Sequence, residues 1–275
     1  MAYHLVVADL DGTARSRRFG VTPRVRQAIA DSRARGVRVC IATGRMWPSA
    51  APWVQLLGAD APVILYNGGR VFDFDCGRTL YDRRLTAEAA LQALAVIRPH
   101  SEVQPHLFVN DRVYVERRHP MTDAYAEEDG LAYEVIPAFE PLVLDDPHKI
   151  LVTGEPAKLE SLDAAARLAT LAAHVVRSEP TKLEILPSGV SKGSALREMV
   201  ARLGIEITDV IAVGDNWNDL EMIEAAGLGV AMADAPEGVR ARADHICGTA
   251  DDEGFRDVLE RFVLGRSPSP TRSSP

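Results

Sequence analysis

The sequence lacks the features of disulfide-rich proteins, of zinc-binding proteins and of membrane or secreted proteins. It contains only three cysteines, Cys40, Cys76 and Cys247. Their number is odd and none of them forms a C-x-x-C pair, which argues against a disulfide framework and against a zinc site. No apolar run reaches the roughly 18 residues of a membrane-spanning helix, and the run near the N-terminus is too short for the core of a signal peptide. We therefore expect a cytoplasmic protein with no membrane partner.

Positive charge is also scarce. Lysine and arginine together number 31 against 39 aspartates and glutamates, so the formal net charge is −8. No long basic stripe offsets this deficit, and binding to a phosphate backbone requires concentrated positive charge, so we expect no nucleic-acid partner. An anionic substrate would instead need a local cation, such as a metal ion, one or two basic side chains or the N-terminus of a helix.

Buried strands and helices alternate at both ends of the chain. An apolar run at 5–8 is followed by a helical pattern at 21–36 and by a second apolar run at 37–43. Strand, helix and strand in that order predict a right-handed βαβ unit and a parallel sheet. The pattern continues with a strand within 61–69, a hairpin turning at Cys76-Gly77, a helix at 191–205, a strand, polar loop and helix at 209–227, a strand ending at 232, a helix from Pro236, a strand near 245–247 and a helix at 252–263.

The pattern changes between these two parts of the chain. From about Thr86 it predicts helices at 86–98, 121–129 and 156–172 and strands at 102–109, 112–116, 148–153, 174–178 and 182–186, which is an α+β arrangement. We therefore expect a discontinuous α/β core with a Rossmann-like parallel sheet, residues 1–82 and 187–266, and an inserted α+β domain at 83–186. The Ser/Pro-rich residues 267–275 predict a disordered tail.

Unusual polar residues follow the predicted strands. In open parallel sheets, ligands bind just beyond the carboxyl ends of the strands. The residues at that place are Asp9 and Asp11, then Thr43, Gly44 and Arg45, then Asn67, and finally Asp215, Asn218 and Asp219. Each group alone also fits a turn or a helix cap. Together with Lys192 they gather carboxylates, a hydroxyl and an amine, and carboxylates held so close need a cation, for which Mg²⁺ suits the oxygen ligands.

Four short motifs carry these residues. They are "DLDGT" at 9–13, "ATGR" at 42–45, the lysine of "GVSKG" at 189–193 and "GDNWND" at 214–219. In this order they resemble the motifs of the haloacid dehalogenase (HAD) superfamily of phosphotransferases. The insertion after the third strand, with "YNGG" before it and "LEILPSGVSKG" at the return, resembles the Cof-type branch (HAD-IIB), which carries a C2B α/β cap. The resemblance covers the chain except for its tail.

The resemblance implies a mechanism for the two aspartates of the first motif. Asp9 would be the nucleophile that forms an aspartyl-phosphate, which splits one difficult displacement into two easier ones. Asp11 would protonate the leaving alcohol and later activate water. Gly12 would permit close approach of the backbone.

The resemblance also implies the ligands of the metal and of the phosphate. Asp9, the backbone carbonyl of Asp11, Asp215 and Asp219 would hold Mg²⁺, or Asp219 would orient Lys192. Thr43 would hydrogen-bond the phosphoryl group and Lys192 would neutralise its charge, the two effects on which phosphoryl transfer depends. The remaining substrate-binding candidates are Gly44, Arg45, Asn67 and Asn218.

Two departures from the Cof-type pattern bear on substrate preference. The loop "ARSRRFG" after the first motif carries Arg15, Arg17 and Arg18 where apolar residues are common, and Asp234 stands where asparagine is common. The leading interpretation is a Mg²⁺-dependent phosphatase, a monomer or homodimer, acting on a small phosphorylated metabolite such as a sugar phosphate or a phosphorylated cofactor. A phosphomannomutase-like phosphotransferase is the alternative enzyme, and a non-catalytic protein that binds phosphorylated metabolites is the alternative of another class.

Overall fold

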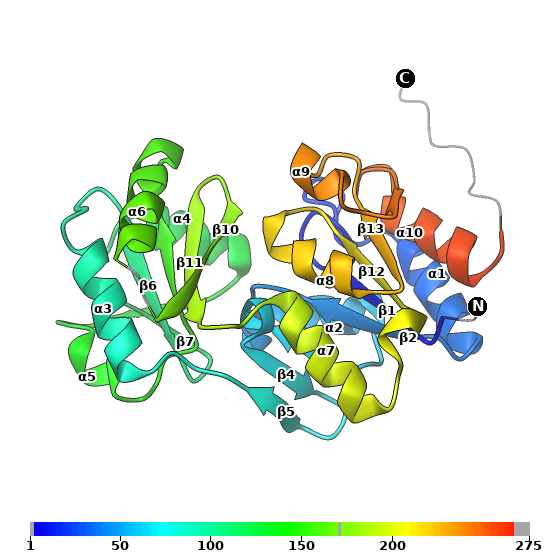
Figure 1. The fold of residues 1–275 in the computed structure, drawn as a ribbon, viewed down its shortest axis with the longest axis horizontal. Coiled ribbons are helices and arrows are strands. Elements are labelled where there is room, and N and C mark those ends of the chain that lie inside the picture. Colours follow the sequence, from blue (N-terminus) through cyan, green and yellow to red (C-terminus); the bar gives the residue numbers. More distant parts are fainter. Residues whose placement is uncertain (1–2, 170–171, 267–275) are drawn as a thin grey trace. The chain divides into compact units, whose positions relative to one another are not determined.

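The computed structural model describes residues 3–169 and 172–266, and the chain divides into two compact units (Figure 1). The first unit contains Met1–Thr43, Ala50–Tyr81 and Ser191–Pro275, and the second contains Gly44–Ser49 and Asp82–Val190. The predicted disordered tail at 267–275 lies outside the described residues.

The first unit is built on an eight-stranded sheet in the order β14-β13-β12-β1-β2-β3-β4-β5. Its strands are β1 (Leu5–Asp9), β2 (Arg38–Ala42), β3 (Val63–Leu65), β4 (Arg70–Asp73), β5 (Arg78–Asp82), β12 (Val210–Gly214), β13 (Leu228–Ala231) and β14 (His245–Ile246). The strands from β14 to β3 run parallel, and β3 pairs with β4 antiparallel. The parallel sheet and the hairpin at Cys76-Gly77 are thus as predicted.

The register of the central strands determines which residues meet at the edge of the sheet. β1 lies between β12 and β2, with Ala8 opposite Val213 and Asp9 opposite Ala42. Because parallel strands end at the same edge, the residues that follow β12 and β2 emerge beside Asp9.

In the described part of the chain, six α-helices accompany the strands of this sheet. They are α1 (Pro23–Ala34), α2 (Trp47–Leu57), α7 (Lys192–Leu203), α8 (Leu220–Ala225), α9 (Glu237–Arg240) and α10 (Gly254–Val258). The helix α2 begins within the second unit. The side chain of Ser191 caps α7 by accepting from the Ser194 amide, and Gly204 ends it in the left-handed conformation. The apolar face of α7, with Leu196 and Met199, packs on the sheet in one buried cluster with Leu5.

The second unit is an α+β structure with its own core. Its six-stranded sheet has the order β10-β11-β9-β6-β7-β8, and every pair is antiparallel except β7 and β8. The strands are β6 (Gln104–Val109), β7 (Arg112–Val115), β8 (Tyr133–Val135), β9 (Lys149–Thr153), β10 (Ala173–Glu179) and β11 (Lys182–Pro187), and the helices are α3 (Ala87–Ile97), α4 (Pro120–Asp129), α5 (Glu140–Val143) and α6 (Pro156–Leu168). Leu94 of α3, Leu107 of β6 and Leu159 of α6 belong to one buried cluster.

The helices α2 and α5 and the strand β8 were not predicted from the sequence, and one predicted helix is divided into two helical segments in the structure. The helix α2 contains Pro52 in its interior, where proline usually breaks a helix. The elements β8 and α5 are only 3 and 4 residues long, too short for a periodic pattern. The predicted helix at 252–263 is α10 followed by a π-helix at Leu259–Val263. Among the described helices, none combines the length and the apolar character needed to cross a membrane.

Candidate active site

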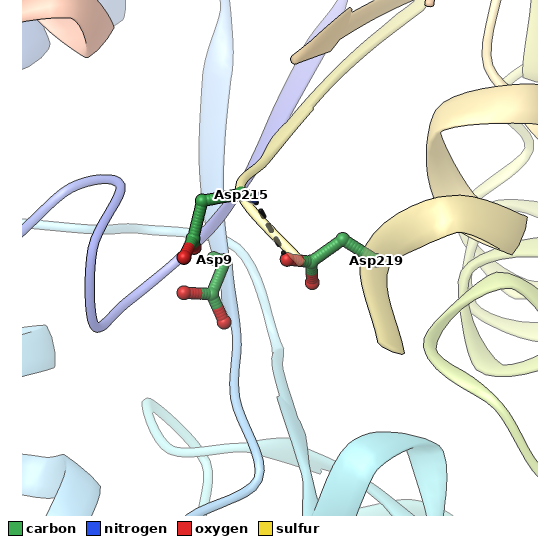
Figure 2. Close-up of side chains that lie close together, drawn as sticks. All are labelled: Asp9, Asp215 and Asp219. Carbon is green, nitrogen blue, oxygen red and sulfur yellow. Dashed lines mark hydrogen bonds between the residues drawn. The ribbon is translucent and has the colours of Figure 1, made fainter. Parts of the chain in front are cut away.

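Three carboxylates converge at the carboxyl edge of the first unit's sheet. Asp9 is the last residue of β1, Asp215 directly follows β12, and Asp219 ends the short helix Trp217–Asp219. One oxygen from each carboxylate lies within 4.8 Å of the other two, and Figure 2 shows the side chains facing one another. The structure therefore brings together residues that lie more than 200 positions apart in the sequence.

Lys192 is the cation within this group. It is the first residue of α7 and is completely buried, and its Nζ donates to Asp9 Oδ1 and Asp219 Oδ1, both at 2.5 Å. Burial by itself would lower the pKa of Lys192, but the charges of Asp219 and Asp9 outweigh burial and raise the pKa. The lysine therefore keeps its charge in an enclosed site.

One ammonium group does not balance three carboxylates. Burial raises the pKa of Asp9 well above its usual value, and the charges of Asp219 and Asp215 raise it further against the opposing effect of Lys192. Burial, followed by the charge of Asp219, raises the pKa of Asp215 to about 7. A cluster of oxygen donors with excess negative charge is the donor set that a divalent cation such as Mg²⁺ takes. The residues present thus fit a divalent cation.

Asp219 also organises the loop that carries Asp215. Its Oδ2 accepts hydrogen bonds from the backbone amides of Asp215 and Asn216, at 3.0 and 3.1 Å, while Oδ1 accepts from Lys192. Gly214 is required beside it, because a Cβ atom at that position would lie 2.4 Å from the Cβ of Asp219. Both oxygens of Asp219 are thus engaged with the protein, which favours the expectation that it orients Lys192.

The first motif holds Asp215 from the opposite side. The Thr13 hydroxyl donates to Asp215 Oδ1 at 2.9 Å. Gly12 has φ +97°, and a Cβ atom there would lie 2.7 Å from Asp215 Oδ2. The turn therefore needs glycine both for its backbone conformation and for the close approach of the carboxylate.

Asp11 is half-buried and forms an ion pair with Arg15. The guanidinium of Arg15 in turn lies 4.1 Å from the centre of the Trp53 ring. The sequence showed three arginines in this loop as a departure from the Cof-type pattern. Their spacing alone did not predict which of them contacts Asp11.

Thr43, Asn67 and Asn218 also lie at the carboxyl edge of the first unit's sheet. Thr43 is 2% exposed, its amide donates to Ile64 at 2.8 Å and its carbonyl accepts from the Asn67 amide at 3.0 Å. The Asn218 side-chain amide donates to Asn67 Oδ1 at 3.0 Å. Among the described residues, Asn67 Nδ2 and Asn218 Oδ1 have no hydrogen-bond partner. A role of these two asparagines in substrate binding stays a prediction.

Asn67 lies in a strained stretch of backbone. Asn67 and the preceding Tyr66 both have φ +53°, a left-handed conformation that bulky side chains rarely adopt. Gly68 packs so closely that a Cβ atom there would lie 2.1 Å from the Ser191 carbonyl. Such strain persists only where the surroundings enforce it, and it is typical of functional sites.

The remaining two candidates, Gly44 and Arg45, belong to the second unit. The carbonyl of Gly44 accepts from Lys149 Nζ at 2.8 Å. Arg45 is buried, its Nη2 lies 3.1 Å from Asp129 Oδ1, and its Nη1 donates to Ser49 Oγ at 2.8 Å. The structure thus supplies both residues with protein partners, and a role in substrate binding stays a prediction.

Sequence reasoning missed a buried ion pair in the second unit. Lys149 Nζ lies 2.7 Å from Glu184 Oε2, and both side chains are almost fully buried. Burial is the largest single effect and would raise the pKa of Glu184, but the charge of Lys149 and the hydrogen bonds from Lys149 and Ser178, with the charge of Lys182, together lower it. The available signal was a charged residue within each of two otherwise apolar strand patterns.

A parallel α/β sheet with an aspartate at the end of its central strand, further carboxylates after the neighbouring strand and a buried lysine is the site of an enzyme of phosphoryl transfer. A family model of the haloacid dehalogenase-like hydrolases matches residues 6–259. The chain belongs to this family, in its Cof-type branch, and is a phosphatase of the HAD type.

Individual relatives are similar over their whole length. The 5-amino-6-(5-phospho-D-ribitylamino)uracil phosphatase YcsE of Bacillus subtilis is 27% identical over 261 residues, which cover 94% of this chain and 96% of YcsE. The pyridoxal phosphate phosphatase YbhA of Escherichia coli is 29% identical over 278 residues, which cover 96% of this chain and 98% of YbhA. The crystal structure of TM0651 from Thermotoga maritima, 30% identical, aligns with a TM-score of 0.80 over 98% of this chain and 99% of that one.

Proposed function

We propose that the protein is a Mg²⁺-dependent phosphatase that hydrolyses a small phosphomonoester through an aspartyl-phosphate on Asp9. The observation that carries the proposal is the buried contact of Lys192 with Asp9 and Asp219, beside Asp215 at the edge of the sheet. This arrangement supplies a carboxylate nucleophile, a fixed positive charge for the phosphoryl oxygens and an acidic group for a metal.

The carboxylates of Asp9 and Asp215, with the backbone carbonyl of Asp11, would hold the metal, and Asp219 would contribute directly or through water. When bound, Mg²⁺ would neutralise charge on the phosphoryl oxygens and on the carboxylates around them. The excess of carboxylates over ammonium groups in the cluster supports this assignment.

In the first step, an oxygen of Asp9 attacks phosphorus and the bond from phosphorus to the alcohol oxygen breaks. Asp11 donates the proton that the departing alcohol needs. In the second step, water attacks the aspartyl-phosphate, Asp11 accepts the proton of that water, and inorganic phosphate leaves with Asp9 restored. Lys192 and Thr43 hold the phosphoryl oxygens in both steps, so that positioning and charge stabilisation are supplied by fixed groups.

The substrate belongs to the small phosphorylated metabolites. The relatives named above act on a phosphorylated cofactor and on a phosphorylated ribityl compound, which supports a sugar phosphate or a phosphorylated cofactor here. We further propose that the unit containing Asp82–Val190 is the cap that selects the leaving group. A cytoplasmic location and a monomeric or homodimeric state stay predictions.

The test is release of inorganic phosphate from p-nitrophenyl phosphate in the presence of Mg²⁺. We expect activity in the wild-type protein, its loss on addition of EDTA, and its loss in Asp9→Asn, which keeps the shape of the side chain but removes the nucleophile. Asp75→Asn, an exposed residue in the turn after β4, is the matched control and should keep full activity. Activity that survives in Asp9→Asn contradicts the proposal.

The phosphomannomutase-like alternative has a distinct outcome. A mutase converts a hexose phosphate from one phosphate position to another without net release of inorganic phosphate. Conversion of that kind, together with the absence of phosphate release from a panel of phosphorylated metabolites, would replace the phosphatase assignment by the mutase.

A further inference from the structure

Arg15 joins the proton-transferring aspartate to an aromatic ring. Its Nη1 donates to Asp11 Oδ1, and its guanidinium lies over the Trp53 ring at 4.1 Å from the ring centre. All three residues belong to the first unit, with Trp53 on α2. Arg15 therefore stands next to the side chain that, in the proposed mechanism, touches the leaving group.

The backbone of this loop keeps Arg15 in place. The amide of Arg15 donates to the Leu10 carbonyl at 2.8 Å, and its carbonyl accepts from the Gly12 amide at 3.0 Å. A guanidinium on the face of an indole ring is attracted by the ring's negative face, and this attraction does not depend on Asp11. Arg15 would thus keep its position when Asp11 turns toward a substrate.

The ion pair observed with Asp11 does not satisfy Arg15 completely. Its Nε is buried and has no hydrogen-bond partner among the described residues. Its side chain is 18% exposed, so a small ligand can reach the guanidinium. If Asp11 turns away, this limited exposure to water does not fully replace the lost carboxylate. During turnover the carboxyl group of Asp11 has to face the leaving oxygen, and Arg15 then needs another anion.

The other cation of the site cannot fill this role. Lys192 is buried and committed to Asp9 and Asp219, on the side where the phosphoryl group is attacked. The net charge of the protein is −8, so the positive group beside Asp11 does not reflect an overall positive charge.

We propose that Arg15 is a substrate-recognition residue, which selects phosphomonoesters whose alcohol carries a second anionic group, a carboxylate or a second phosphate. This inference rests on the proposed role of Asp11. The planar fork of arginine matches both anions, and the second anion takes the place that Asp11 leaves when it turns toward the leaving oxygen.

Matched substrate pairs test the proposal. Phosphoglycolate and ethyl phosphate differ by a carboxylate in place of a methyl group, and ethylene glycol bisphosphate and its monophosphate differ by the second phosphate. We expect the wild-type protein to have a higher kcat/KM for the anionic member of one pair, and the pair that shows this preference identifies which anion is recognised. Equal kcat/KM values within both pairs overturn the proposal.

The variant Arg15→Gln then attributes the preference to this residue. We expect the ratio of kcat/KM within the preferred pair to fall by about 10- to 100-fold, the usual worth of a hydrogen bond to a charged group. Most of the loss should appear as a raised KM for the anionic ester. Arg15→Met, which still packs on Trp53, serves if the glutamine variant folds poorly. Arg18→Gln, an exposed arginine of the same loop, is the control and should keep the wild-type ratio.

Failure of the inference is distinguishable from failure of the proposed function. A protein that hydrolyses p-nitrophenyl phosphate but whose ratio changes less than about threefold in Arg15→Gln contradicts only the recognition role, because exposed ion pairs produce changes of that size. A wild-type protein that hydrolyses none of these esters contradicts both.

Discussion

Lys192 and Asp219 form a fully buried ion pair, with 2.5 Å between Nζ and Oδ1. Breaking a buried pair by removing one charge typically costs about 3–5 kcal/mol, because the other charge stays buried without compensation. Removal of either charge should therefore destabilise the first unit and also impair the proposed chemistry.

For Asp219→Asn we expect a free energy of unfolding lower by about 3 kcal/mol and a kcat lower by about 100-fold, since Lys192 loses its orientation. Urea unfolding and phosphate release measure the two effects. Glu198→Gln breaks an exposed ion pair with Arg202 on the same helix and should change stability by less than about 0.5 kcal/mol. Additive effects of Asp219→Asn and Lys192→Met in the double variant would show that the two residues are not coupled.

For Gly12→Ala we expect the Mg²⁺ concentration at half-maximal activity to rise by about tenfold or more, because the new Cβ displaces Asp215. Gly20→Ala is a matched control: it also has positive φ, at +66°, but no atom lies within 4 Å of a Cβ built there. Both variants should lose about 1 kcal/mol of stability from backbone strain. A Mg²⁺ requirement that rises equally in both would contradict the steric explanation.

Mg²⁺ should stabilise the protein more strongly as the pH rises. The pKa of Asp215 is raised to about 7 by burial and then by Asp219, so its ionisation in the metal-free protein costs stability as the pH rises from the usual aspartate range toward 7. Mg²⁺ binds the ionised carboxylate, so its apparent affinity should be about tenfold weaker near pH 6 than near pH 8. Thermal unfolding with and without Mg²⁺ at the two pH values measures this difference. A stabilisation by Mg²⁺ that is independent of pH would contradict it.

The second unit should lose stability in mild acid through His106. Burial lowers the pKa of His106 to about 4 from 6.5, while its ring nitrogens contact the Leu151 carbonyl and the Thr122 hydroxyl. Because the pKa of His106 is lower in the folded than in the unfolded protein, its contribution to stability is complete above the unfolded-state pKa. That contribution is lost as the pH falls toward the folded-state pKa. Between about pH 7.5 and pH 5, this residue should account for a loss of about 2 kcal/mol.

Urea unfolding of the wild-type protein and of His106→Gln at both pH values isolates that loss. Both proteins share the titration of the carboxylates, so the difference between them reports the histidine. An identical loss of stability in the two proteins would show that His106 is not responsible.

Local patterns in the sequence were sufficient for much of the fold. Buried strands at 5–8 and 37–43, with a helix between them, predicted the parallel sheet, because side-chain periodicity and the handedness of βαβ units act over short distances. The helix expected at 191–205, found as Lys192–Leu203, was predicted for the same reason. The helix α2 was not predicted, because its interior proline is locally unfavourable for a helix. The three-residue strand β8 was not predicted, because so short a segment has no clear local preference and depends on the strand it pairs with.

By itself, the sequence determined which residue types follow each strand, because motif order and spacing are properties of the chain. Only the tertiary structure decided which of these side chains meet. Asp215 reaches Thr13 across 202 positions, and Arg15, among three arginines of one loop, pairs with Asp11 over Trp53. Arg45, two residues after Thr43 in the sequence, pairs with Asp129. Strand register and long-range packing place charges in three dimensions, and neither is encoded in the spacing of a motif.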